Sequence, residues 1–220
     1  MQYTKIHGVE LESANDAVVM KFKREGSFED ESVDLWLDSM KKGHVALDVG
    51  CYTGLYSILA VKAGFPCIGF EPNETAIKRA ESNAVHNDVE IEVMPFALSD
   101  ESGQATLSLK GKRPLTSAAS IASSHADGAN VSVNTATIDE LDLPVPVSVM
   151  KIDAERSEPA VLLGGLEVIK RDKPVIITEC LDGQTTLEVS DIMTKLGYRW
   201  RALDSCMIAW TPTRRGKKEK

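Results

Sequence analysis

The stretch ALDVGCYTG, residues 46–54, decides the fold of this chain, together with the strand-like segment CIGFEP at residues 67–72. An apolar run ends at Asp48, and glycines allow a tight turn before an amphipathic helix starts after Gly54. A helix start offers unpaired N–H groups and a partial positive charge. Because Glu71 ends the next apolar run, where an acid can bind ribose hydroxyls, the pattern predicts a nucleotide-cofactor site.

The glycine spacing favours one cofactor over another. Dinucleotide-binding turns use GxGxxG, whereas this chain has DxGxxxG, with Cys51 following Gly50. A carboxylate at Asp48 would repel a pyrophosphate but can bind the ammonium group of an amino acid. The turn therefore suits S-adenosylmethionine (SAM) better than NAD, the alternative being an ordinary strand-to-helix turn without a ligand.

Length and composition indicate one globular domain. The chain has 220 residues, of which 43% are hydrophobic and 26% charged, as in proteins with a continuous core. It contains no apolar run of about 20 residues, so we expect no membrane span. The N-terminus lacks the basic start and apolar core of a secretion signal, and we therefore expect a cytoplasmic protein.

The net charge of −8 argues against broad electrostatic attraction to nucleic acid, so a nucleic-acid partner is not expected. The basic segment RRGKKEK, residues 214–220, is the exception; it is interpreted as a disordered solubilising end, with a phosphate-contacting arm as the alternative. The four cysteines are isolated, so neither a metal site nor a disulfide framework is predicted. The oligomeric state is left open.

Alternating strand and helix signals from residue 44 to about 196 predict an α/β fold, a doubly wound and mostly parallel seven-stranded sheet. The helical stripes have one apolar face each, so those helices should cover a sheet. The strand candidates are HVALDV at 44–49, PCIGFE at 66–71, VEIEVM at 89–94, VSVMKID at 147–153 and PVIITEC at 174–180.

Three segments depart from simple alternation. Residues 198–212, YRWRALDSCMIAWTP, read as a C-terminal antiparallel hairpin. Strand-like QATLSLK at 104–110 and VSVNTATI at 131–138 flank a Ser- and Ala-rich stretch that we expect to be a mobile loop over the site. We expect the first 28 residues to form a hairpin that caps the cofactor cleft.

These observations divide the chain into three parts. We expect an N-terminal extension or cap at 1–28, an α/β domain at 29–212 that contains the SAM-binding turn, and a basic disordered tail at 213–220.

A second group of polar residues follows the strand at 147–153. Alternation places Lys151 and Asp153 on one face of that strand, and Glu155 and Glu158 come just after it. Ligands in open α/β sheets bind beyond the carboxyl ends of strands. Buried carboxylates are costly unless they are paired or functional, so this group marks an active site, with a purely structural Lys151–Asp153 ion pair as the alternative.

Five motifs occur in order along the chain: LDVGCYTG at 47–54, FEPN at 70–73, FALSDESG at 96–103, TIDEL at 137–141 and KIDAERSEPAVLLGG at 151–165. In this combination the chain resembles the FkbM family of SAM-dependent methyltransferases over roughly residues 26–180. The resemblance implies a class I methyltransferase fold and methyl transfer to oxygen, commonly on a sugar or polyketide hydroxyl.

The resemblance also implies a set of cofactor contacts. Glu71 would hold the ribose, Phe96 and Ala97 would border the adenine, and the residues near Asp48 would shape the methionine end. The full set is Glu29, Asp48, Gly50, Cys51, Tyr52, Gly54, Glu71, Pro72, Phe96 and Ala97. The family usually has Ala-Asn where this chain has Cys51 and Tyr52, which would preserve backbone contacts but not those of the asparagine side chain.

The catalytic candidates are Lys151, Asp153, Glu155 and Glu179, and the resemblance implies that the first three face the acceptor. We choose Asp153 as the general base, because burial at a strand end would raise its pKa. Glu179 is the second choice, with capping of a neighbouring helix as its alternative role, and His125 is the third.

Arg156 stands where the family motif KIDVEG has glycine. Its side chain could pair with Glu155 or Glu158, or could bind an anionic acceptor.

Taken together, the motifs and the resemblance predict an O-methyltransferase that acts on a hydroxyl of a sugar or another small molecule. The alternatives are a SAM-binding protein without catalysis, a methyltransferase for nucleic acid or protein, and a nucleotide-dependent oxidoreductase; no N/DPPY/F tetrapeptide is present.

Overall fold

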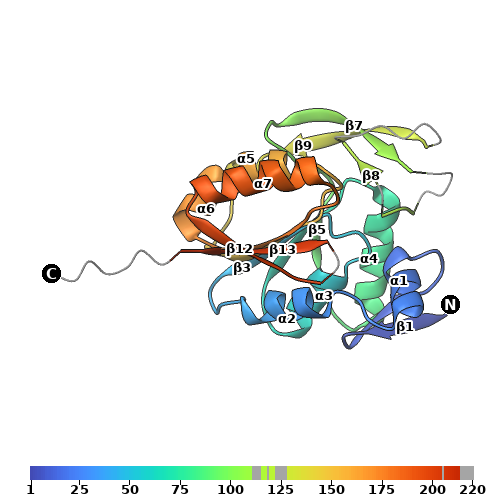
Figure 1. Ribbon diagram of the computed structural model, residues 1–220. Coiled ribbons are helices and arrows are strands. Elements are labelled where there is room, and N and C mark those ends of the chain that lie inside the picture. The colour runs from blue at the N-terminus through green and yellow to red at the C-terminus, as the bar shows by residue number, and fades with distance from the viewer. Residues whose placement is uncertain (111–114, 118, 122–127, 205, 214–220) are drawn as a thin grey trace.

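Short Val- and Ile-rich strands form the centre of the protein, in a seven-stranded sheet of order β12-β13-β11-β10-β3-β4-β5 (Figure 1). The computed structural model describes residues 1–110, 115–117, 119–121, 128–204 and 206–213. Five strands run parallel: β3 (Val45–Val49), β4 (Cys67–Phe70), β5 (Glu92–Met94), β10 (Val147–Ile152) and β11 (Val175–Glu179).

The two central strands, β3 and β10, are buried along their whole length. Their register places Lys151 directly beside Asp48 and Ile152 beside Val49. Because parallel strands end at the same edge of a sheet, residues that are far apart in the sequence meet at one place. This edge carries the motif turn and the polar residues that follow β10.

The C-terminal hairpin predicted at 198–212 is confirmed. It consists of β12 (Tyr198–Ala202) and β13 (Met207–Pro212), which pair antiparallel, and β13 is also antiparallel to β11. The seven-stranded sheet is therefore mixed: the hairpin strands lie at one edge, and the five parallel strands extend from β11 to the opposite edge at β5.

Helices cover both faces of this sheet (Figure 1). On one face, α2 (Asp30–Asp38) and α3 (Leu55–Lys62) bury apolar side chains, and α4 (Glu74–His86) adds Ala84 to the same cluster. On the other face, α5 (Glu158–Leu163), α6 (Leu166–Asp172) and α7 (Gly183–Lys195) pack in a second cluster. The sheet therefore has one hydrophobic layer on each side, as the single apolar stripes of the helices predicted.

The expected hairpin over the first 28 residues is wrong in its second half. A hairpin does form from β1 (Tyr3–Ile6) and β2 (Val9–Glu12), but residues Ala17–Glu25 form helix α1. Asp16 caps this helix by accepting a hydrogen bond from the Val19 N–H, and Gly26 ends it in the left-handed conformation. These capping residues outweigh the weak alternation that suggested a strand.

A second sheet of order β6-β9-β7-β8 lies beside the carboxyl edge of the first. Its strands are β6 (Ala97–Leu98), β7 (Gly103–Leu109), β8 (Ala119–Ser120) and β9 (Asn130–Ala136), and a 3₁₀ turn, η1 (Ile138–Glu140), follows. The strand-like flanks predicted at 104–110 and 131–138 are therefore paired with one another. Most of the loop expected between them lies outside the described residues.

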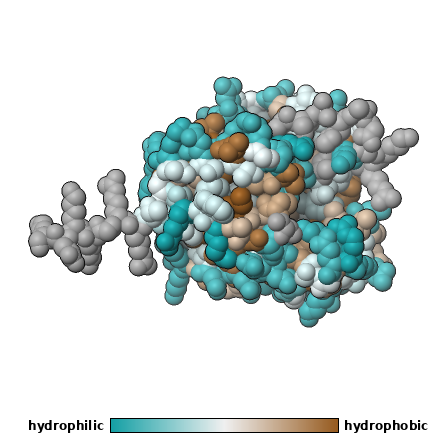
Figure 2. Space-filling view, viewed as in Figure 1, coloured by the Kyte–Doolittle hydropathy of each residue, from teal (hydrophilic) through white to brown (hydrophobic). Residues whose placement is uncertain are grey.

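The face seen in Figure 2 is mostly hydrophilic, with hydrophobic side chains gathered between α7 and the β12–β13 hairpin. Leu187 on α7 and Trp200 on β12 are among the large exposed hydrophobic residues. Across the ranges that the structure describes, no helix combines the length and apolarity needed to cross a membrane. The basic segment 214–220 lies outside those ranges.

The buried Asn83 of α4 connects the N-terminal hairpin to the motif turn. Its Oδ1 accepts a hydrogen bond from the Glu12 N–H, and its Nδ2 donates one to the Thr53 carbonyl, both at 2.9 Å. Asn83→Ala leaves two backbone groups unpaired, so we expect the free energy of unfolding to fall by about 2–4 kcal/mol in denaturant titrations. The exposed Ser82→Ala on the same helix should change it by less than about 0.5 kcal/mol, and equal losses would contradict this account.

Candidate active site

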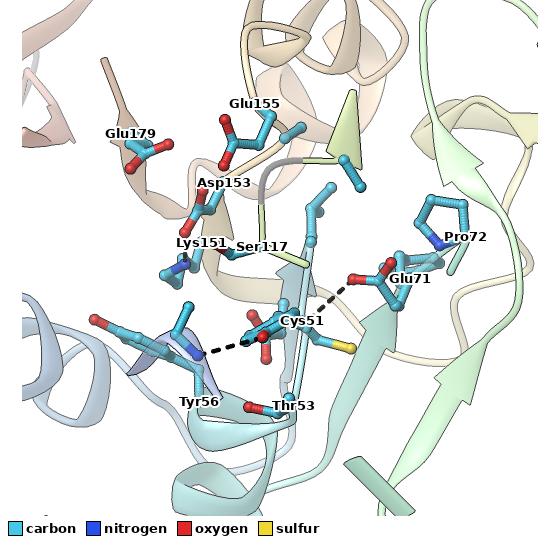
Figure 3. Close-up of a pocket in the computed structure, with 18 of the residues that line it drawn as sticks. Cys51, Thr53, Tyr56, Glu71, Pro72, Ser117, Lys151, Asp153, Glu155 and Glu179 are labelled. Atoms are coloured by element: carbon cyan, nitrogen blue, oxygen red, sulfur yellow. Dashed lines mark hydrogen bonds and ion pairs between the residues drawn. The ribbon is translucent and has the colours of Figure 1, made fainter. Parts of the chain in front are cut away.

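A cavity opens where β3, β4, β10 and β11 end (Figure 3). Its other walls come from α1, the turn before α2, the start of α3 and the second sheet. It brings together most of the residues predicted for the site: Glu29, Asp48, Gly50, Cys51, Tyr52, Glu71, Pro72, Ala97, Lys151, Asp153, Glu155 and Glu179. Gly54 and Phe96, which were predicted with them, do not line it.

Gly50 brings the ends of β3 and β10 into contact. It has a φ of +77°, and a Cβ at this position would lie 1.9 Å from the Asp153 carbonyl oxygen. The backbone continues the contact, since the Asp153 N–H donates to the Val49 carbonyl at 3.0 Å. The close approach of the neighbouring strand therefore requires glycine at position 50, whether or not a ligand also approaches the turn.

Gly54 and Phe96 contribute to packing behind the cavity. Gly54 has a φ of +88°, and a Cβ there would lie 3.1 Å from the Ala80 Cβ, so this glycine lets α3 approach α4. The Phe96 ring packs against Phe70 with 5.7 Å between centroids, and Phe70 lines the cavity. The structure thus places Phe70, and not Phe96, on the cavity wall.

Glu71 is buried at the end of β4, and backbone donors orient its carboxyl group. Oε2 accepts a hydrogen bond from the Tyr52 N–H at 3.0 Å, and Oε1 accepts one from the Asn73 N–H at 2.8 Å. Burial raises the pKa of Glu71 to about 7, although these hydrogen bonds act in the opposite direction. A carboxylate has further lone pairs, so this group can still accept hydrogen bonds from a ligand in the cavity.

Lys151 is the buried cation at the centre of the cavity. Its Nζ lies 2.7 Å from Asp153 Oδ2 and 4.8 Å from the centroid of the Tyr56 ring (Figure 3). Burial would lower the pKa of Lys151, but attraction to Asp153, Glu29 and Asp48 outweighs it and raises that pKa above its usual value. Lys151 is therefore charged at neutral pH.

The reason for choosing Asp153 as the general base is wrong. Burial alone would raise the pKa of Asp153, but attraction to Lys151 and the hydrogen bond from it outweigh burial and lower that pKa. The alternation of β10 already placed these two side chains on one face, and the 2.7 Å contact makes them an ion pair. A carboxylate held in this way is a weak proton acceptor.

Tyr56 is a site residue that the sequence interpretation missed. It lies on α3, and its hydroxyl donates a hydrogen bond to Glu29 Oε2 at 2.9 Å. Glu29, at the start of α2, has a φ of +50°, and its carboxyl lies 3.7 Å from Lys21 Nζ. Tyr56 lies within the largely apolar and buried run at residues 55–60, and a buried tyrosine hydroxyl needs a polar partner, which was the available signal.

Glu155 and Glu179 line the same end of the cavity as Asp153 (Figure 3). Burial and the neighbouring Asp153 carboxylate raise the pKa of Glu155 to about 7 and that of Glu179 to about 9. Cys206 Sγ donates to Glu179 Oε1 at 3.4 Å. Glu179 does not cap α7, because Asp182 is the capping residue of that helix.

Arg156 pairs with neither of its expected partners. Its Nε donates to Asp182 Oδ2 at 2.7 Å, and it does not line the cavity. Its φ of +77° explains why glycine suits this position in the family motif. Glu158 stabilises the same turn by accepting the N–H groups of Ala154 and Arg156.

His125, the third candidate for the base, lies outside the described residues. In the part of the chain that the structure describes, no group of three or more His, Cys, Asp or Glu residues is arranged to hold a metal ion.

Residues 48–200 match the family described as the methyltransferase FkbM domain. The chain belongs to this family. The resemblance drawn from the motifs is thereby confirmed, and the protein is a methyltransferase by family. No curated protein matches the sequence.

Three solved structures show the fold. The methyltransferase FkbM from Methylobacillus flagellatus KT has a TM-score of 0.55 and 15% identity; the match covers 76% of this chain but 43% of that one. The ribosomal protein L11 methylase from Lactobacillus delbrueckii subsp. bulgaricus has a TM-score of 0.53 and 16% identity; the match covers 84% of this chain and 78% of that one. The Pyrococcus abyssi tRNA (uracil-54, C5)-methyltransferase has a TM-score of 0.54 and 17% identity; the match covers 95% of this chain and 43% of that one. The protein therefore has the class I methyltransferase α/β fold.

The contact between Gly50 and Asp153 can be measured by substitution. Gly64 has a similar φ of +84° with no atom within 4 Å of a Cβ, so Gly64→Ala should cost about 1–2 kcal/mol of backbone strain alone. Gly50→Ala adds a clash with the Asp153 carbonyl, and overpacking adds about 1–3 kcal/mol. Denaturant unfolding of both variants should show the larger loss at Gly50, and equal losses would remove the proposed constraint.

Proposed function

We propose that this protein is a SAM-dependent methyltransferase that methylates a hydroxyl group of a small molecule such as a sugar. The observation that carries the proposal is the cavity at the ends of β3, β4 and β10. There the motif turn, the oriented Glu71 carboxyl and the Lys151–Asp153 pair of an FkbM domain meet.

The cavity residues suit SAM. The Glu71 carboxyl is oriented so that it can accept hydrogen bonds from the two ribose hydroxyls. Asp48 lies at the turn where the methionine ammonium would bind, and it accepts a hydrogen bond from the Ser57 hydroxyl at 2.7 Å. Among the described residues that line the cavity, carboxyl groups outnumber cations, which favours a ligand with positive charge. The Pyrococcus enzyme of the same fold is described in complex with S-adenosyl-L-homocysteine, which supports the same choice of cofactor.

When bound, SAM supplies an electrophilic methyl group on a sulfonium. Glu155 is the residue best suited to remove the proton from the acceptor hydroxyl, because its pKa of about 7 matches neutral conditions. Glu155 would accept the hydroxyl proton, and bound SAM would supply the methyl group, its carbon–sulfur bond being replaced by the new oxygen–carbon bond with the electron pair left on sulfur. Lys151 and Asp153 hold the acceptor end of the cavity in place, which favours an in-line geometry.

The acceptor is proposed to be a small molecule because of charge. Two of the structural relatives are described as acting on tRNA and on a ribosomal protein. In this chain the net charge of −8 and the acidic cavity disfavour a phosphate backbone. A noncatalytic SAM-binding protein would not require a carboxyl with a pKa near 7 at the acceptor end, and a DxGxxxG turn does not suit the dinucleotide of an oxidoreductase.

Glu71→Gln tests the cofactor assignment. Removing the charge that accepts the ribose hydroxyls should weaken SAM binding roughly ten- to hundredfold, as measured by isothermal titration calorimetry. The exposed Glu81→Gln on α4 serves as the matched control and should bind SAM like the parent. Unchanged affinity in the Glu71 variant, or no SAM binding by the parent protein, would contradict the proposal.

The pH dependence tests the base. At saturating SAM, kcat/KM for the acceptor should fall as the pH drops through about 7, because Glu155 accepts the proton only when it is ionised. Glu155→Gln should lower kcat by about 10²- to 10⁴-fold and remove this step from the profile. The exposed Glu90→Gln should retain both the rate and the step. A Glu155 variant with the parental profile would assign the base to another group.

A further inference from the structure

The cavity contains two carboxylate–lysine pairs, and in each pair the opposite charges compensate one another. Lys151 lies 2.7 Å from Asp153, and Lys21 on α1 lies 3.7 Å from Glu29. Lys21 also lies 5.1 Å above the Phe28 ring. Among the described residues that line the cavity, Lys21 and Lys151 are therefore already close to carboxylates of the protein, and neither is the obvious partner of an anionic acceptor.

Glu155 and Glu179 remain after this pairing. Among the described residues, neither side chain makes an ion pair, and Arg156 and Lys110 act on Glu155 only as secondary, opposing charges. In that part of the chain the buried Glu179 Oε2 accepts no hydrogen bond from a protein donor, and the Glu179 carboxyl hydrogen-bonds with Asp153 when one of the two is protonated. Figure 3 shows both carboxyls beside Asp153. This end of the cavity is thus acidic, with an acceptor atom available on Glu179.

We propose that the acceptor carries a protonated amine near its reacting hydroxyl, and that Glu179 binds this ammonium group. The substrate class is then an amino alcohol or an amino sugar. This inference rests on the proposed function, and it specifies the chemical class of the methyl acceptor that binds in the same cavity. Glu179 is a residue that determines specificity, whereas Glu155 takes the hydroxyl proton.

Electrostatics explains why a cation fits where the cavity is acidic. Glu179 faces Asp153 and Lys151 from β10, Glu155 from the following turn and the Cys206 thiol from the start of β13. Without a ligand, burial raises the pKa of Glu179, and repulsion from Asp153, a hydrogen bond to the Asp153 carboxylate and repulsion from Glu155 add to this, so Glu179 keeps a proton at neutral pH. An ammonium group supplies the positive charge instead, so the proton is released when the amine binds.

The same interaction would direct the reaction to oxygen. An ammonium nitrogen has no lone pair, so an amine held in its charged form by Glu179 cannot attack the methyl group. A neighbouring hydroxyl retains its lone pairs and lies near Glu155. Two carboxyls that differ in pKa, about 7 for Glu155 and about 9 for Glu179, thus suit two different tasks.

A matched pair of probes tests this inference on the full chain loaded with S-adenosylhomocysteine. The probes are methyl 2-amino-2-deoxyglucoside and methyl glucoside, titrated by calorimetry at pH 7.0, below the pKa of the amine. We expect the amine to bind roughly ten- to hundredfold more tightly. Repeating the titration in buffers of different ionisation enthalpy should show up to one proton released with the amine and none with the neutral sugar.

Glu179→Gln should reduce the affinity for the amine to that for the neutral sugar and abolish proton release. The exposed Glu101→Gln should leave both unchanged. Equal binding of the two probes, no binding of the amine, or proton release that persists in the Glu179 variant would overturn the inference. S-adenosylhomocysteine binding, measured first, separates these results from a failure of the proposed function.

Discussion

The approach of the Asp153 carbonyl to Gly50 is the constraint on which the site depends. Any side chain at position 50 would collide with that carbonyl, so glycine allows the ends of β3 and β10 to meet. This contact fixes Asp48 beside Lys151 and brings Asp153 to the motif turn. Residues separated by about half of the chain thereby form one cavity, held together by backbone groups as well as side chains.

Burial of many carboxyl groups around two lysines gives the cavity its chemistry. Asp153 keeps a low pKa because Lys151 pairs with it, whereas Glu71, Glu155 and Glu179 have raised pKa values because burial is not offset by a comparable cation. One group of similar side chains therefore offers a fixed ion pair, a proton acceptor and groups that respond to a ligand's positive charge.

Periodicity and glycine spacing predicted the strands around Asp48, Lys151 and Glu179 and the terminal hairpin, because buried parallel strands leave a clear apolar pattern. The pKa of Asp153 and the partner of Arg156 depend on distances between side chains, which the sequence does not contain. The Lys151 contact reversed the expected pKa of Asp153, and Asp182 rather than Glu155 paired with Arg156. Helix α1 was mistaken for a strand because the short apolar alternation in this segment was taken for a strand pattern and its capping residues, Asp16 and Gly26, were overlooked.

A crystal structure of the full chain with S-adenosylhomocysteine tests the central claim most directly. The account predicts that both ribose hydroxyls lie within hydrogen-bonding distance of Glu71. It also predicts that the homocysteine portion lies along the turn at Gly50 and that the sulfur faces the end of the cavity formed by Asp153 and Glu155. A ligand bound elsewhere, or a ribose that makes no contact with Glu71, would contradict it.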